Sequence, residues 1–341
     1  NCDFVESSKF NTWDVKVLGC SSILIYRRQI IRYRFNKPFN QILYIYLMFR
    51  HQEYQYLDLV RRIINHGEIV KGRNGNVKQV FGECMRFSLS DRIPILTTKR
   101  VAWKTCLREL LWFVRGSTNN QELKDKKCNI WNANATREFL DSRGLMKRKE
   151  DDLGPIYGYQ WRNFNYPYVD CNFKPERKHG DQLADIIKQL KNPDTRSSRR
   201  LVMTTWNPLQ LDEMALPPCH ILAQFHVSGE KMNKLSCALY QRSADVALGM
   251  PFNISSYSFL TYLIANECGL EPFEFVYFIG NAHIYENHLY AMTSQLHREP
   301  YEFPTCEIKE RQNRTFDTYD ENDFIIKNYN HHPKIYMEMV A

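Results

Sequence analysis

Residues 219–245 read CHILAQFHVSGEKMNKLSCALYQRSAD, and this stretch decides the fold. In its first nine residues, every second side chain is apolar or a thiol and the residues between them are His, Leu and Gln. That period of two is typical of a β-strand with one buried face. Residues 234–241 are also rich in strand-forming residues, and Gly229 lies between the two runs. We therefore predict two strands joined by a hairpin at Gly229.

Helical and strand patterns surround this hairpin. Apolar residues at helical spacing predict helices at 57–64, 102–115, 182–190 and 254–268. The last of these is apolar nearly all round, which indicates a helix buried in the core. Strand-forming residues predict further strands at 199–206 and 273–280. Strands outnumber the helices between them, which is typical of an α+β fold rather than a regularly alternating α/β fold.

The first 50 residues differ from the rest of the chain. Residues 15–52 contain seven Lys and Arg and no Asp or Glu, whereas the whole chain has 46 Lys+Arg against 38 Asp+Glu. The remainder is therefore nearly neutral, and no specific nucleic-acid surface is indicated. We interpret 1–50 as a basic N-terminal segment or linker, with a strand at 21–28 and a linker or crossover helix at 37–50. Residues 51–341 form one domain in this interpretation.

Cysteine usage indicates the redox compartment of the protein. The ten cysteines form no CxxC pair and no Cys/His cluster with zinc spacing, so we expect no metal site and a reducing compartment. We predict a cytoplasmic protein. The mitochondrion is the alternative, because an acid-free stretch is typical of a presequence. Since the chain begins with Asn1, we expect a fragment or a processed product.

Several functional classes have no support in the sequence. The longest uncharged apolar-rich stretch, 39–49, is too short to span a bilayer, so we expect no membrane segment. Neither a phosphate-binding GxxxxGKS/T loop nor a dinucleotide-binding GxGxxG loop is present, and HExxH and GxSxG are also missing.

The segment ALPPCH at 215–220 is the most specific chemical signal. Two prolines stiffen the backbone just before a strand, so Cys219 is held at a strand end. His220 and nearby arginines would lower the pKa of the thiol and make Cys219 a nucleophile. On these residues alone, a buried structural cysteine is the alternative.

A second polar cluster ends the next strand. Gln241, Arg242, Ser243 and Asp245 follow one another closely, and Asn253 comes just before the helix that looks buried. A polar group at the mouth of a buried helix needs a partner. An Asn amide donates and accepts at once, so Asn253 can bind the edge of uracil, which presents N3–H and O4. An ordinary helix cap is the alternative.

Three arginines are candidates for binding phosphate. Arg199 and Arg200 adjoin at the start of the strand predicted at 199–206. Paired guanidinium groups suit a phosphate dianion, because each binds two oxygens. Arg73 lies in the glycine-containing loop 72–76 and is a weaker candidate for the same role. Solvated arginines are the alternative for all three.

Glu109 is the candidate acid or base. On a helix it shares an apolar face with Trp112 and Phe113, and a carboxyl in such surroundings has a raised pKa. A carboxylate at the helix margin, paired with Lys or Arg, is the alternative. His283 and Tyr285 alternate on one strand face, where they are candidates to bind a ribose hydroxyl or are ordinary structural groups.

From about residue 51 to residue 341, the chain resembles the thymidylate synthase family nearly end to end. The resemblance rests on segments in the family's order: TTKR at 97–100, ELLWF at 109–113, DLGPIYG at 152–158, WR at 161–162, ALPPCH at 215–220, residues 240–253 and MEM at 337–339. EYQYL at 53–57 and GNAH at 280–283 resemble the synthase half of bifunctional dihydrofolate reductase–thymidylate synthases of protists. The resemblance implies a mixed sheet packed against helices, with the sheet at a homodimer interface. It also implies that 1–50 is the remnant of a preceding reductase domain plus a linker.

The resemblance implies reductive methylation of dUMP to dTMP, with 5,10-methylenetetrahydrofolate consumed as cosubstrate and dihydrofolate released. Cys219 would add to C6 of the uracil ring. The other implied catalytic residues are Glu109, Tyr157, Arg242, Asp245 and Asn253. The implied dUMP-binding residues are Arg73, Arg199 and Arg200 (the last two from the other subunit), His220, Gln241, Arg242, Ser243, Ala244, Asn253, His283 and Tyr285. The implied folate-binding residues are Glu109, Ile130, Trp131, Asn134, Asp245, Leu248, Phe252 and Ala341. The family's Arg-Thr-Gly-Thr loop is Arg73-Asn74-Gly75-Asn76 in this chain.

Two other functions stay open. A deoxycytidylate hydroxymethylase is a close chemical relative, but a cytosine edge favours Asp where this chain has Asn253. A catalytically silent structural or RNA-binding homologue is the other alternative. The presence of Cys219, Glu109 and Arg242 argues against lost activity, and the nearly neutral body argues against general RNA binding.

Overall fold

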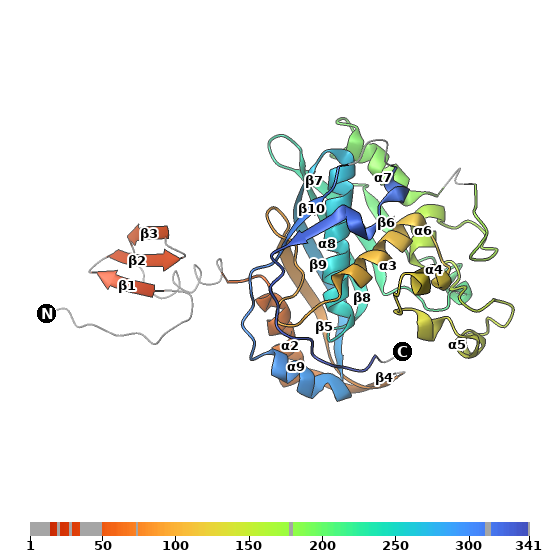
Figure 1. The fold of residues 1–341 in the computed structure, drawn as a ribbon, viewed down its shortest axis with the longest axis horizontal. Coiled ribbons are helices and arrows are strands. Elements are labelled where there is room, and N and C mark those ends of the chain that lie inside the picture. Colours follow the sequence, from red (N-terminus) through yellow and green to blue (C-terminus); the bar gives the residue numbers. More distant parts are fainter. Residues whose placement is uncertain are drawn as a thin grey trace. The chain divides into compact units, whose positions relative to one another are not determined.

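The structure is a computed structural model that describes residues 14–18, 21–26, 29–34, 50–72, 74–176, 180–310 and 315–339. The chain divides into two compact units, with the division between residues 51 and 52. The first unit contains an antiparallel sheet of order β1–β2–β3, with β1 (Asp14–Leu18), β2 (Ser21–Tyr26) and β3 (Gln29–Arg34) (Figure 1). The strand predicted at 21–28 is thus β2. The linker or crossover helix predicted at 37–50 lies outside the described residues, apart from its last residue.

A six-stranded sheet of order β4–β5–β9–β8–β7–β6 forms the centre of the second unit. Its strands are β4 (Glu68–Gly72), β5 (Gly75–Ser88), β6 (Val202–Thr204), β7 (His220–Ser228), β8 (Lys234–Asp245) and β9 (Glu271–Tyr285). β8 and β9 run parallel, and all the other neighbours are antiparallel, so the sheet is mixed. β7 and β8 form the predicted hairpin, and Gly229 in its turn has a φ of 87°, a conformation that favours glycine.

Helices pack on this sheet and bury its inner face (Figure 1). They are α2 (Tyr54–His66), α3 (Trp103–Arg115), α4 (Asn120–Asp125), α5 (Arg137–Ser142), α6 (Tyr157–Asn163), α7 (Gln182–Lys191), α8 (Gly249–Cys268) and α9 (Leu289–Gln295). Short 3₁₀ turns are η1 (Asn132–Asn134), η2 (Leu211–Glu213), η3 (Glu286–His288), η4 (Phe316–Thr318) and η5 (Glu321–Asp323), and a separate antiparallel pair joins β10 (Thr305–Ile308) to β11 (Phe324–Lys327). The predicted α+β fold is confirmed. None of the helices in the described part of the chain is both long and apolar enough to cross a bilayer.

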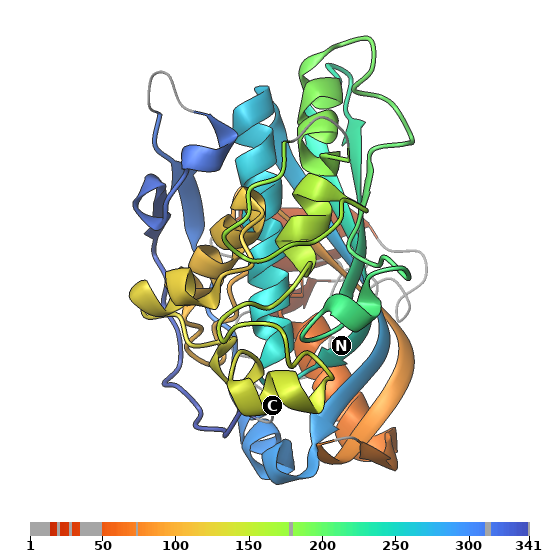
Figure 2. The same ribbon diagram turned by 90° about the vertical axis from the view of Figure 1, so that its right-hand side faces the viewer.

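The central helix is α8, which lies along β8 and β9 and packs against α3 and α7 (Figure 2). It begins at Gly249, earlier than the predicted residue 254. Pro251 fits in the first turn because its missing N–H has no helical acceptor there. The buried hydroxyls of Ser255 and Ser258 donate to carbonyls one turn earlier, which permits polar side chains inside the core. Asn253 therefore lies in the body of the helix, and a helix cap is not its role.

A glycine brings α6 close to α3. The Cα of Gly158, in the first turn of α6, lies so near the backbone of Phe113 that an added Cβ would come within 2.7 Å of the Phe113 Cα. A side chain at this position would push the two helices apart. The contact places Tyr157, the first residue of α6, beside the helix that carries Glu109.

Candidate active site

Cys219 lies immediately before β7 and is half-buried. Its backbone N–H donates a hydrogen bond of 2.7 Å to the hydroxyl oxygen of Tyr157. Arg242 on β8 donates from its backbone N–H to the Cys219 carbonyl at 3.0 Å. The Arg242 guanidinium also donates to the carbonyls of Pro218 (2.9 Å) and Pro217 (3.1 Å). The two prolines thus supply acceptors that hold a fixed positive charge beside the cysteine.

Tyr157 connects the cysteine to the helical layer. Its buried ring packs against Phe113, Trp131 and His220, with centroid distances of 4.9, 5.9 and 5.0 Å. Burial raises the pKa of Tyr157 well above its usual range, so the phenol stays protonated. Since its oxygen already accepts from the Cys219 N–H, its own hydrogen is left to donate.

Glu109 is buried on α3, and its Oε1 accepts a hydrogen bond of 2.8 Å from Trp131 Nε1. Burial raises the pKa of Glu109 to about 7, although the Trp131 hydrogen bond opposes the rise. The carboxyl therefore exchanges its proton near neutral pH, which suits a proton-transfer group. The carboxyl is buried, as the apolar sequence pattern predicted. The side chain that donates to it is an indole rather than Lys or Arg.

A second set of contacts surrounds Asn253. Its Nδ2 lies 2.7 Å from His220 Nε2, and its Oδ1 accepts from Gln241 Nε2 at 3.0 Å. Burial lowers the pKa of His220 to about 3, so the imidazole is neutral. His220 therefore brings no positive charge to the neighbouring Cys219. The charge beside Cys219 belongs to Arg242.

Further candidate residues lie at the C-terminal ends of β8 and β9, which are neighbouring parallel strands. Asp245 pairs with His283 in the parallel register. Asp245 Oδ1 accepts from the N–H groups of Ala247 (2.9 Å) and Leu248 (3.3 Å), which shapes the turn into α8. The rings of His283 and Tyr285 lie edge to face with centroids 5.5 Å apart, on one face of β9 as predicted.

A family model described as thymidylate synthase matches residues 54–341. The chain belongs to the thymidylate synthase family. It is 47% identical over 306 residues to the bifunctional dihydrofolate reductase–thymidylate synthase of Plasmodium chabaudi, covering 89% of this chain and 51% of that protein. The protein of the same name from Paramecium tetraurelia is 47% identical over 298 residues (87% and 63%), and that from Zea mays is 48% identical over 293 residues (86% and 55%). The chain thus spans only about half to 63% of the length of these relatives.

The residues that the thymidylate synthase resemblance singled out are not all placed at this site. Arg73 and Ala341 lie outside the described residues. Arg199 and Arg200 are exposed in a turn, and the strand that follows begins only at Val202. Their predicted position at the start of a strand is wrong, because a turn formed by the Val202 N–H and the Arg200 carbonyl precedes β6.

The residues implied for folate binding in a thymidylate synthase surround η1 and the start of α8. Trp131 is buried, whereas Ile130, Asn134, Leu248 and Phe252 are half-buried. Ser243 is half-buried, and Ala244 between it and Asp245 is buried, so its methyl group belongs to the core.

Two residues at the site were not predicted from the sequence. Tyr277 on β9 is buried, and its hydroxyl donates to Gln241 Oε1 at 2.6 Å. Trp206 lies beside Arg242, with the guanidinium carbon 5.6 Å from the ring centre. Tyr277 could have been identified from the period of two on β9, because counting back from His283 by twos places Tyr277 on the same face of the strand.

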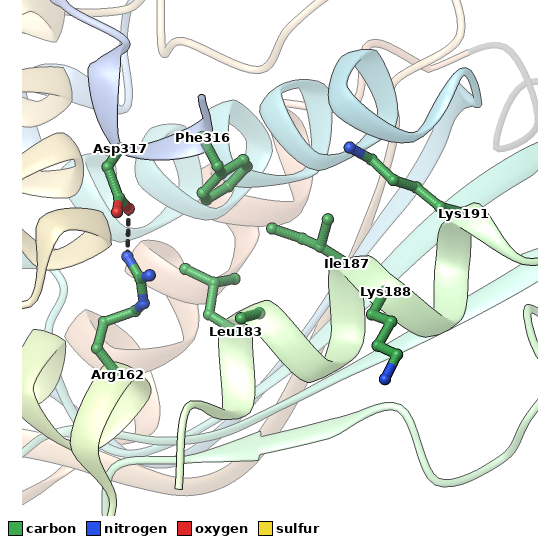
Figure 3. Close-up of a pocket in the computed structure, with 8 residues that line it drawn as sticks. Arg162, Leu183, Ile187, Lys188, Lys191, Phe316 and Asp317 are labelled. Carbon is green, nitrogen blue, oxygen red and sulfur yellow. Dashed lines mark hydrogen bonds and ion pairs between the residues drawn. The ribbon is translucent and has the colours of Figure 1, made fainter. Parts of the chain in front are cut away.

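A cavity of about 390 Å³ lies elsewhere, between α6, α7 and η4 (Figure 3). Leu183, Ile187 and Phe316 form its apolar wall. Arg162 at its edge pairs with Asp317 and also with Asp181, so its charge is neutralised. The lining contains no thiol or imidazole and shares no residue with the site around Cys219. In the described part of the chain, no group of three or more His, Cys, Asp or Glu side chains is arranged to hold a metal ion.

Proposed function

We propose that this chain converts dUMP and 5,10-methylenetetrahydrofolate into dTMP and dihydrofolate. The observation that carries the proposal is the series of contacts from Glu109 through Trp131 and Tyr157 to Cys219. It places a nucleophile and a proton-transfer group at one site with a phenol between them. Residues 51–341 are the synthase domain in this proposal, residues 1–50 are the preceding segment or linker, and the compartment is the cytoplasm.

Cys219 is the proposed nucleophile. Its thiolate forms a bond to C6 of the pyrimidine, and the electron pair of the C5–C6 double bond moves toward O4, which makes C5 nucleophilic. Arg242 favours the thiolate through its positive charge. Asn253 retains one amide hydrogen and one lone pair beyond its bonds to His220 and Gln241, which matches the O4 acceptor and N3–H donor of uracil.

The site has the groups that a reduced folate needs. When bound, 5,10-methylenetetrahydrofolate supplies the one-carbon unit and the hydride that complete the methyl group. Asp245 uses Oδ1 in its turn, so Oδ2 is the oxygen that would accept from the N–H groups of a pterin. Trp131 supplies an aromatic wall, and Glu109 with its pKa near 7 takes up the proton that leaves C5.

We also propose a homodimer formed through the outer face of the sheet. Phe278, Tyr240 and Val202 are 42%, 41% and 37% exposed and alternate with the core residues of β9, β8 and β6. Tyr240 and Phe278 are paired neighbours, so their apolar surface is continuous. A second copy on this face would cover it, and Arg199 and Arg200 would be donated to the partner's site.

An absorbance assay of dihydrofolate formation tests the proposed reaction. We expect turnover with dUMP and little with dCMP, because the Asn253 amide matches uracil. Consumption of dCMP without dihydrofolate would favour the hydroxymethylase, because that reaction takes its hydroxyl from water and leaves the folate as tetrahydrofolate. No turnover of either nucleotide by a folded dimer would favour the silent homologue.

A further inference from the structure

A series of hydrogen bonds connects four buried or half-buried side chains and includes Asn253, the residue proposed to bind the base. The hydroxyl of Tyr277 donates to Gln241 Oε1 at 2.6 Å. Gln241 Nε2 donates to the Ser243 carbonyl at 2.8 Å and to Asn253 Oδ1 at 3.0 Å. Asn253 Nδ2 lies 2.7 Å from His220 Nε2.

The Ser243 carbonyl and the Tyr277 hydroxyl together set the direction of the bonds in this series. The Ser243 oxygen can only accept, so Gln241 must turn its Nε2 and not its Oε1 toward it. The second hydrogen of Nε2 then requires that Asn253 present Oδ1. Asn253 Nδ2 consequently points at His220 Nε2, which must accept, so the imidazole proton lies on Nδ1.

Tyr277 completes the series at its other end. Gln241 Oε1 is left as an acceptor, and the Tyr277 hydroxyl is its donor. Tyr277 is 0% and Gln241 2% exposed, so water does not replace a lost hydroxyl. A buried acceptor without a donor is costly, and removing the hydroxyl would relax the orientation of the Gln241 amide.

The orientation of the Asn253 amide decides which pyrimidine it fits. Uracil presents an N3–H donor and an O4 acceptor, whereas cytosine presents an N3 acceptor and an amino donor. An amide turned by half a rotation would therefore match cytosine. We propose that Tyr277 is a positioning residue that orients the Asn253 amide through Gln241 and so favours uracil over cytosine. This inference rests on the proposed function, because it concerns how that site selects its substrate.

Tyr277→Phe tests the inference. We expect the ratio of kcat/KM for dUMP to kcat/KM for dCMP to fall about three- to tenfold, as the loss of one hydrogen bond predicts. Tyr262→Phe is the matched control, because it removes a buried hydroxyl on α8 that donates to the Leu89 carbonyl at 2.7 Å. That control should lose stability without changing the ratio. A Tyr277→Phe variant that loses both activities by the same factor would overturn the inference.

A measurement on the wild-type protein tests the same hydrogen bonds without any activity. Nitrogen NMR of labelled histidine, with the His220 signal assigned from its loss in His220→Gln, should show a protonated Nδ1 and a bare Nε2. A protonated Nε2 would overturn the inference even if Tyr277→Phe failed to fold. If the wild type formed no dihydrofolate from dUMP, the proposed function would fail. If Asn253→Asp changed the substrate ratio and Tyr277→Phe did not, only this inference would fail.

Discussion

The backbone N–H of Cys219 donates to the hydroxyl of Tyr157 across a separation of 62 residues in the chain. The bond joins the start of β7 to the start of α6, so the candidate nucleophile is positioned by the sheet and by the helical layer together. It also uses the phenol oxygen as an acceptor, which directs the phenol hydrogen away from the cysteine backbone.

Cys219→Ser and Cys219→Ala should both lower dTMP formation to below about one thousandth of the wild-type rate, since they remove the nucleophile. Binding of dUMP should weaken by less than about tenfold, because the other proposed contacts remain. Turnover assays and calorimetric titration with dUMP measure the two effects. Cys171→Ser, at another half-buried cysteine, is the control and should stay active. Near-normal turnover in either Cys219 variant would remove the nucleophile assignment.

Glu109→Gln should change how stability depends on pH. Burial raises the pKa of Glu109 from 4.5 to about 7, so between these values the folded protein binds more protons than the unfolded chain. The free energy of unfolding contributed by this group therefore falls as the pH rises through that window. The variant has no such titration and should gain up to about 3 kcal/mol relative to wild type between pH 4.5 and 7.

Urea unfolding at several pH values measures this gain. Gln keeps an oxygen that can accept from Trp131, so the comparison isolates the titration. Glu138→Gln, at an exposed carboxyl on α5, is the control and should follow the wild-type pH dependence. Parallel curves for Glu109→Gln and wild type would show that the Glu109 pKa is ordinary.

Asn253→Asp should lower kcat/KM for dUMP and produce measurable turnover of dCMP. The change removes the donor that faces O4 and adds an acceptor for the amino group of cytosine. The ratio of the two kcat/KM values should shift at least about tenfold, since exchanging a hydrogen bond for an unsatisfied group costs at least about 1.4 kcal/mol. Asn266→Asp, at an exposed position of the same helix, is the control. An unchanged ratio would assign Asn253 a purely structural role.

Cys219→Ala and Arg199→Ala subunits should complement each other if the sites are shared between subunits. Each variant alone should be nearly inactive. Randomly mixed subunits should recover about a quarter of the wild-type rate, because about half of the dimers are mixed and each holds one complete site. Lys188→Ala, at an exposed basic residue of α7, controls for the loss of surface charge. A mixture no more active than its two parents would show that Arg199 does not serve the partner's site.

Local patterns in the sequence determined much of the fold. The period of two over residues 219–227 and the glycine after it specified the hairpin of β7 and β8, since alternation and turn chemistry are properties of neighbouring residues. The apolar stripe around Glu109 likewise implied a buried carboxyl. The start of α8 and the length of β6 were less predictable. Tertiary contacts decide where a helix or an edge strand begins and ends.

The electrostatics and donor directions of the site were decided only by the tertiary structure. His220 follows the candidate nucleophile in the sequence, and burial against Tyr157 and Tyr257 keeps it neutral. The Tyr277 hydroxyl bonds to a residue 36 positions away, a pairing that the parallel β8–β9 register creates. Desolvation and long-range hydrogen bonds depend on which distant segments pack together, and no local pattern contains that information. The sequence by itself therefore determined the kinds of residue at the site, and the packing decided their protonation and orientation.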